Sequence, residues 1–193
     1  IYYICGETVD KIDLLPQVES FKDKGYMILY CTDYMDEFVL QTLGAYQEMK
    51  LVNISKENID LSDEEDKKKI EEKNEKEKEL LKVMEEALPD VLSVRFTNRL
   101  KSHPVCLVSS GDVTIEMEKV INAMPTDEEV KANKVLEINA SHEIVKKLES
   151  LYKENQDALR NYSKILYAQA RLIEGLPIEN PTELANLICD ELV

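Results

Sequence analysis

The stretch NQDALRNYSKILYAQARLIEGLPIENPTELANLICDELV, residues 155–193, carries the strongest structural signal of the chain. Apolar residues recur at helical spacing on both sides of a Gly-Leu-Pro break, which predicts two amphipathic helices, over 155–174 and 180–193. Gly175 suits the left-handed position that ends a helix, and residues 180–183 (Asn-Pro-Thr-Glu) combine an N-cap, a first-turn proline and a capping-box acid. Neither helix can cover its apolar face alone, so we expect the hairpin to pair with a second copy of itself.

Pairing of two such hairpins predicts a homodimer held by an intermolecular four-helix bundle. The expected interface residues are the apolar positions of both helices: Leu159, Tyr162, Ile165, Leu166, Leu172, Ile173, Leu184, Leu187, Ile188 and Leu192. A fully buried Leu or Ile contributes roughly 1.5–3 kcal/mol. Several of them per hairpin, counted twice by symmetry, outweigh association costs of about 4–15 kcal/mol.

Composition and charge limit the classes of function. The chain has 193 residues, room for one or two domains, and it starts with isoleucine, so we expect it to be part of a longer protein. Its net charge of −15 repels phosphate backbones and anionic lipids, which argues against nucleic acid and membranes as partners. No apolar run approaches the roughly 20 residues of a membrane-spanning helix. The four cysteines are far apart and form no CxxC pair. Unpaired cysteines are typical of proteins in a reducing compartment, so we expect a cytoplasmic protein.

Three parts are expected along the chain: a small α/β unit over 1–55, a charged connecting helix over 56–88, and a second α/β unit with the terminal hairpin over 89–193. In the first part, short apolar strands alternate with helical segments, in the order 1–5, 14–24, 26–31, 35–46 and 51–55. This alternation is typical of parallel βαβ units.

The connecting segment opens with the capping box Ser62-Asp63-Glu64-Glu65 and becomes apolar only from Leu80. We therefore expect one helix that projects into solvent before it docks. The second unit shows strand patterns near 92–97, 105–109 and 135–138, with a helix over 112–124. The fold class is α/β, or α+β overall.

Catalytic and metal sites find little support in the sequence. There is no GxGxxG and no GxxxxGK[ST] loop for a phosphate. His103 and Cys106 are close in sequence, but an apolar strand and the turn before it explain them better than a metal or a nucleophile does, and His142 reads as a helix-start residue. The acids of 63–66 lack EF-hand spacing. We therefore predict no catalytic residue and no metal ligand.

Six short motifs, in this order, are similar to those of bacterial-type ninety-kilodalton heat-shock chaperones: Ile1-Tyr2-Tyr3-Ile4, Phe21-Lys22-Asp23-Lys24-Gly25-Tyr26, Thr32-Asp33-Tyr34-Met35-Asp36-Glu37, Thr97-Asn98-Arg99-Leu100, Leu136-Glu137-Ile138-Asn139 and Leu172-Ile173-Glu174-Gly175-Leu176-Pro177. The resemblance implies the end of the family's middle domain over 1–55 and its C-terminal dimerisation domain over 89–193. It also implies that ATP and Mg²⁺ bind outside this chain, which would hold no cofactor and not hydrolyse ATP by itself.

The resemblance further implies contact with unfolded or partly folded client proteins. One client patch falls on Glu37, Phe38 and Gln41, and the second falls on an exposed helix over 112–124, at Val113, Ile115 and Met117. Phe38 and Val113 stand where the family commonly has tryptophan and methionine. The chain ends Asp190-Glu191-Leu192-Val193, without the tail that recruits tetratricopeptide co-chaperones in eukaryotic relatives.

Two other functions fit parts of the sequence. An enzyme could bind a small ligand at the strand ends of the first unit, beside Glu7, Asp33 and Asp36. A purely structural oligomerisation module would instead bury the whole of 112–124. A pocket that gathers the three acids would favour the enzyme, and exposure of Val113, Ile115 and Met117 would favour the client platform.

Overall fold

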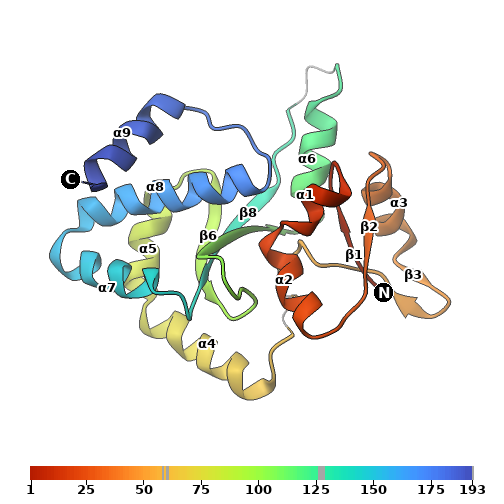
Figure 1. The fold of residues 1–193 in the computed structure, drawn as a ribbon, viewed down its shortest axis with the longest axis horizontal. Coiled ribbons are helices and arrows are strands. Elements are labelled where there is room, and N and C mark those ends of the chain that lie inside the picture. Colours follow the sequence, from red (N-terminus) through yellow and green to blue (C-terminus); the bar gives the residue numbers. More distant parts are fainter. Residues whose placement is uncertain (58, 60, 126–128, 193) are drawn as a thin grey trace.

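The computed structural model describes residues 1–57, 59, 61–125 and 129–192. For residue 192, only the backbone is described. Its first unit, residues 1–53, is built on a parallel three-stranded sheet in the order β2-β1-β5. The strands are β1 (Tyr2–Cys5), β2 (Ile28–Cys31) and β5 (Val52–Asn53). The helices are α1 (Val9–Asp13), α2 (Pro16–Asp23) and α3 (Asp36–Leu43). The predicted parallel βαβ arrangement is confirmed (Figure 1).

The first unit also holds two elements that the sequence pattern did not predict. The helix expected over 14–24 is α2, with Leu15 as its N-cap, and the short helix α1 before it was not predicted. The expected helix over 35–46 ends at Leu43, and an antiparallel hairpin follows, made of β3 (Ala45–Tyr46) and β4 (Met49–Lys50). The core beneath these elements consists of fully buried apolar side chains: Ile4, Ile12, Val18, Phe21 and Ile54.

The second unit, residues 64–192, contains a mixed sheet in the order β6-β8-β7. β6 (Val91–Thr97) runs parallel to β8 (Asn133–Asn139), and β7 (Val105–Ser110) runs antiparallel to β8. Successive side chains of a strand point to opposite faces of the sheet. One face, with Leu136 and Ile138 of β8, packs in the main core under α5 (Lys78–Glu86), α7 (Ile144–Glu154) and α8 (Gln156–Ile173). The other face carries Glu137 and Val135 toward the first unit.

The connecting helix is broken at Glu77 into α4 (Glu64–Lys76) and α5. Asp63 caps α4 by accepting a hydrogen bond from the N–H of Asp66 at 2.9 Å. Although the side chains of α4 are exposed or half-buried, the helix does not project freely into solvent. The Asn74 side chain donates to the carbonyl of Phe96 at 3.0 Å and accepts from its N–H at 2.8 Å, which fixes α4 beside β6. The amide matches the free backbone edge of β6, and Ile70 of α4 packs against the main core, so α4 docks without a full apolar stripe.

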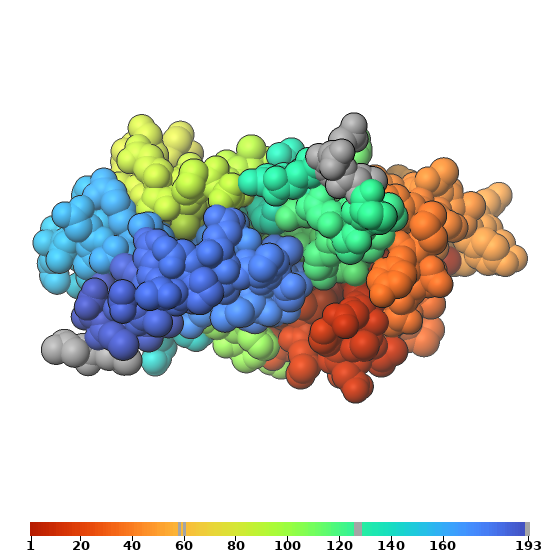
Figure 2. Space-filling model, turned by 90° about the horizontal axis from the view of Figure 1, so that it is seen from above, coloured from red at the N-terminus to blue at the C-terminus, as the bar shows by residue number. Residues whose placement is uncertain are grey.

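The terminal hairpin consists of α8 and α9 (Pro181–Leu192). Its predicted caps are confirmed: Gly175 has a φ of 72°, and the side chain of Asn180 accepts from the N–H of Glu183 at 3.1 Å. The hairpin and the β3–β4 hairpin lie at opposite ends of the long axis of the molecule (Figures 1 and 2). Among the described residues, the helices are too short or too polar to cross a membrane.

Candidate functional site at the junction of the two α/β units

The linking segment, residues 54–57, joins the two units by pairing with the edge of β7. The N–H of Ser109 donates to the carbonyl of Ser55 at 3.1 Å, and the N–H of Glu57 donates to the carbonyl of Ser109 at 2.9 Å. Lys56 and Ser109 form a parallel bridge. Backbone hydrogen bonds therefore hold the units together in addition to the chain itself.

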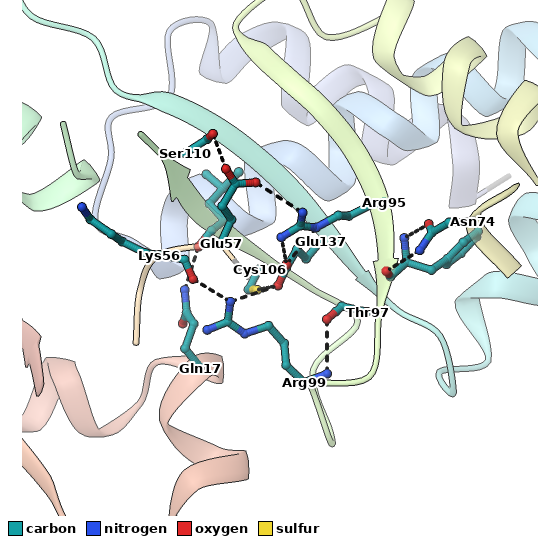
Figure 3. A network of polar contacts seen from close by, with 12 residues as sticks. Gln17, Lys56, Glu57, Asn74, Arg95, Thr97, Arg99, Cys106, Ser110 and Glu137 are labelled. Atoms are coloured by element: carbon teal, nitrogen blue, oxygen red, sulfur yellow. Dashed lines mark hydrogen bonds and ion pairs between the residues drawn. The ribbon is translucent and has the colours of Figure 1, made fainter. Parts of the chain in front are cut away.

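Arg99, on the connection between β6 and β7, is the centre of the junction (Figure 3). Its side chain is only 2% exposed. The guanidinium donates to the carbonyl of Lys56 at 3.0 Å and also to that of Ile54, and it lies 3.5 Å from the Glu137 carboxylate. Arginine suits this place because its planar fork spans several acceptors at once. One buried cation thus contacts the linking segment and the sheet of the second unit.

Arg95 extends the network toward solvent (Figure 3). It lies 2.7 Å from the Glu137 carboxylate and 3.3 Å from that of Glu57, which also accepts from the Ser110 hydroxyl. The Cys106 thiol lies 3.7 Å from Glu137, and burial, with the nearby Glu137 charge, raises the pKa of Cys106 well above its usual value. Cys106 is therefore a protonated structural thiol in the sheet.

A second contact joins α2 to the turn after α8. The buried Gln17 amide donates to the carbonyl of Leu107 at 2.7 Å and to the carboxyl of Glu174 at 2.7 Å. Burial raises the pKa of Glu174. Oε1 of Gln17 has no hydrogen-bond partner among the described residues.

Helix α3 adjoins α6 (Ile115–Asn122), so the structure brings the two predicted client patches together. Their contact includes a hydrogen bond at 2.9 Å from the Gln41 amide to the carbonyl of Asp112. Glu37 is 1% exposed and accepts from the Asn53 amide at 2.8 and 2.9 Å, and burial raises its pKa. These two residues position α3 against the rest of the molecule.

The expected exposure of the client residues is therefore corrected by the structure. Glu37, Ile115 and Met117 are buried, and Phe38, Gln41 and Val113 are half-buried. Ile115 and Met117 turn inward because the side chain of the N-cap Thr114 fixes the start of α6 and Ser109 accepts the Ile115 N–H at 2.9 Å. The helix is not wholly buried either, since Asn122 is exposed.

Exposed apolar side chains lie on the opposite side of α3 and on the segments directly before and after this helix. We define the α3 apolar face by its members, which are between 48% and 72% exposed: Tyr34, Met35, Val39, Leu43, Tyr46 and Met49. Positions two apart on a helix differ by about 200°, so Val39 lies opposite both Glu37 and Gln41. The i, i+4, i+8 spacing of Met35, Val39 and Leu43 is the sequence signal that would have identified this face.

A cavity of about 890 Å³ lies between the two units, lined by residues of α1, α6 and the turn after α8. Of the three acids proposed for a ligand site, Glu7 lines this cavity. Asp33 and Asp36 instead stabilise the start of α3: the Asp33 carboxylate accepts from the N–H of Met35, and that of Asp36 accepts from the N–H of Asp33, both at 3.0 Å. The acids therefore do not gather as an enzyme site would require.

The histidines have local partners. Nδ1 of His103 lies 3.4 Å from the Glu19 carboxylate, and Nδ1 of His142 accepts from the N–H of Ile144 at 3.1 Å. Within the part of the chain that the structure describes, there is no group of three His, Cys, Asp or Glu side chains that could hold a metal ion.

The predicted dimer residues differ in how exposed they are. Leu159 and Leu166 are buried in the core of their own chain, so they are not available to a partner. Leu172 is 59% exposed and Ile188 is 39% exposed. Several others are half-buried: Tyr162, Ile165, Ile173, Leu184 and Leu187. The side chain of Leu192 lies outside the described residues.

Comparison with known proteins gives a match over the whole chain. Residues 1–193 match the family described as "Hsp90 protein". The chain is 47% identical over 194 residues to a protein named "Chaperone protein HtpG" from Bacillus subtilis (strain 168). The aligned region covers 100% of the chain and 31% of that relative. It is 48% identical over 187 residues to the protein of the same name from Clostridium acetobutylicum, covering 96% of the chain and 30% of the relative. The chain thus spans about a third of the length of these relatives.

Proposed function

Because the chain belongs to the Hsp90 family, we propose that it is the dimerising and client-binding part of an ATP-dependent chaperone of the bacterial cytoplasm. The observation that carries the proposal is the separation of two exposed apolar surfaces, the α3 apolar face and the terminal hairpin, at opposite ends of the molecule. Apolar side chains in water favour a partner. Two surfaces that far apart can serve two different partners at once.

The terminal hairpin is the proposed homodimer surface. Its buried side already packs against the body of the chain, which leaves Leu172, Leu184, Leu187 and Ile188 for a partner. Their helices are joined by a short loop and stay in contact, so the hairpin can dock as one preformed unit. The proposed dimer interface is therefore smaller than the sequence predicted, and it consists of hairpin residues that are exposed or half-buried.

The α3 apolar face is the proposed client surface. Methionine and tyrosine suit a surface that must accept many unfolded sequences, because methionine is flexible and tyrosine combines an apolar ring with a polar tip. Glu37 and Gln41 contribute indirectly, since they hold α3 in the orientation that exposes Val39 and Leu43. ATP and Mg²⁺ are proposed to bind in other parts of the longer protein, and the function proposed for this chain needs no catalytic residue.

Suppression of aggregation tests the client surface. Val39 and Leu43 are just over half exposed, so covering both by a client contributes about 2 kcal/mol, a roughly 30-fold effect on affinity. We expect the variant Val39→Asp/Leu43→Asp to lose most of its protection of an unfolded test protein, measured by light scattering.

A matched control is Leu92→Asp on β6, because Leu92 is 58% exposed and lies outside the α3 apolar face. This variant should protect as well as the parent. Equal protection by the α3 variant and the parent, with both folded by circular dichroism, would show that clients bind elsewhere.

A further inference from the structure

Cys5 and Cys31 are direct neighbours in the parallel sheet of the first unit. They end β1 and β2, and they pair in register. The N–H of Gly6 donates to the carbonyl of Cys31 at 3.1 Å, so the strands stay together at this point. Paired strands are about 4.8 Å apart, which lies within the roughly 4.4–6.8 Å between the Cα atoms of disulfide-bonded cysteines. Residues in register point to the same face, so both thiols face the same neighbours.

The two thiols interact with one another. Both residues are buried in one small cluster with Tyr3, at 8% and 6% exposure. The hydrogen bond between them lowers the pKa of Cys31 and, together with burial, raises the pKa of Cys5. A thiolate is the reactive form of cysteine, so Cys31 is the more nucleophilic partner and Cys5 is poised as the second thiol.

Small reagents have a route to Cys5, and Cys31 is its direct neighbour in the sheet. Cys5 lines the cavity of about 890 Å³ between the two units, together with Gly6 and Tyr34. The low exposure of both cysteines keeps protein thiols away, whereas a molecule as small as a peroxide fits the cavity. The other cysteines lack this arrangement: Cys106 is fully buried against Glu137, and Cys189 is exposed on α9.

We propose that Cys5 and Cys31 are a modification site at which a small peroxide forms an intrachain disulfide between β1 and β2. The Cys31 thiolate attacks one peroxide oxygen, the O–O bond breaks, and hydroxide leaves and takes up a proton to become water. Cys5 then attacks the resulting sulfenic sulfur, the S–S bond forms, and a second water leaves. The two thiols together lose two electrons and two protons, and hydrogen peroxide is reduced to two molecules of water.

Mass spectrometry of the 193-residue chain treated with hydrogen peroxide tests the proposal. Free thiols are blocked with an alkylating reagent after denaturation, and the protein is digested without reductant. We expect one crosslinked peptide pair containing Cys5 and Cys31, and its disappearance after a thiol reductant is added. Cys31→Ser should remove the crosslink, whereas Cys106→Ser and Cys189→Ser should retain it.

The parent protein alone can overturn the proposal, so the test does not depend on the folding of a variant. Recovery of Cys5 and Cys31 in the alkylated form, while Cys189 is oxidised, would show that peroxide does not reach the pair. A crosslink that joins Cys5 or Cys31 to Cys189 would equally contradict the assignment, because it would place the reactive partner outside the sheet.

Discussion

Replacing Arg99 with methionine tests whether buried charge holds the two units together. Methionine keeps much of the length of the side chain and fills irregular space well, so the change removes the charge and the hydrogen bonds with little loss of packing. The carbonyls of Ile54 and Lys56 would lose their donor, and Glu137 would lose one of its two arginine partners.

The expected cost follows from these contacts. Removing one partner of a buried ion pair costs about 3–5 kcal/mol, and a hydrogen bond from a charged group contributes about 1.5–3 kcal/mol. Because Glu137 keeps its contact with Arg95 at 2.7 Å, we expect the lower end, about 3 kcal/mol. Such a loss is a large fraction of the roughly 5–15 kcal/mol that stabilises a folded domain.

Lys101 provides a matched control for this experiment. It lies on the same β6–β7 connection and pairs with Asp23 of the first unit, but its side chain is 58% exposed. Exposed ion pairs contribute about 0–1 kcal/mol, so Lys101→Met should barely change stability.

Urea unfolding followed by circular dichroism measures both variants. We expect Arg99→Met to lower the midpoint strongly or to separate the unfolding of the two units into two transitions. Equal midpoints for Arg99→Met and Lys101→Met would refute the view that the buried network carries the junction.

Two further predictions concern the terminal hairpin and the turn that follows α8. Leu187→Asp places a charge at a half-buried position of α9 in the proposed interface, so we expect a folded monomer at micromolar concentration, and a dimer mass in light scattering would reject the interface. Glu174→Gln should raise the melting temperature at pH 8 and leave it nearly unchanged at pH 4. The pKa of Glu174 is raised above 4.5, so the folded chain binds more protons than the unfolded chain and loses stability as pH rises from 4.5 through the folded-state pKa. An equal effect of this substitution at both pH values would contradict that assignment.

Local patterns were enough to predict the main strands and the terminal hairpin. Val94 and Phe96 are buried on β6 with half-buried Arg95 between them, as the strand pattern predicted, and Asn180 caps α9 as its capping box indicated. Leu92, expected on the same face, is exposed because the register shifts between Val91 and Ser93. The β3–β4 hairpin was missed because its turn residues are Gln47 and Glu48, both with positive φ. Two-residue hairpin turns usually show Asn or Gly at such positions, so residues 47 and 48 carry no turn signal.

Other differences arise because an amphipathic pattern predicts that one side of a helix is buried but does not identify which part of the same chain, or which partner, packs against it. The stripe of α8 predicted burial correctly, but Leu159 and Leu166 pack in the core of their own chain instead of against a partner. Glu37 was expected at the surface as part of a client patch, yet Asn53 donates to both of its carboxyl oxygens inside the molecule. Contacts between residues far apart in sequence decide such cases, and a single sequence does not show them.

The junction gains its importance from the distance between the two proposed surfaces. A dimer joined through the terminal hairpins would place the two α3 apolar faces far from the dimer axis. Each face would lie at the end of one arm, by which we mean one protomer extending from the dimer axis. The direction of each arm then depends on how firmly the first unit is held to the second. An apolar contact could slide, whereas Arg99 must meet two specific carbonyls and one carboxylate, which specifies a single orientation at some cost in stability. We infer that the network sets the angle at which the two arms approach a client.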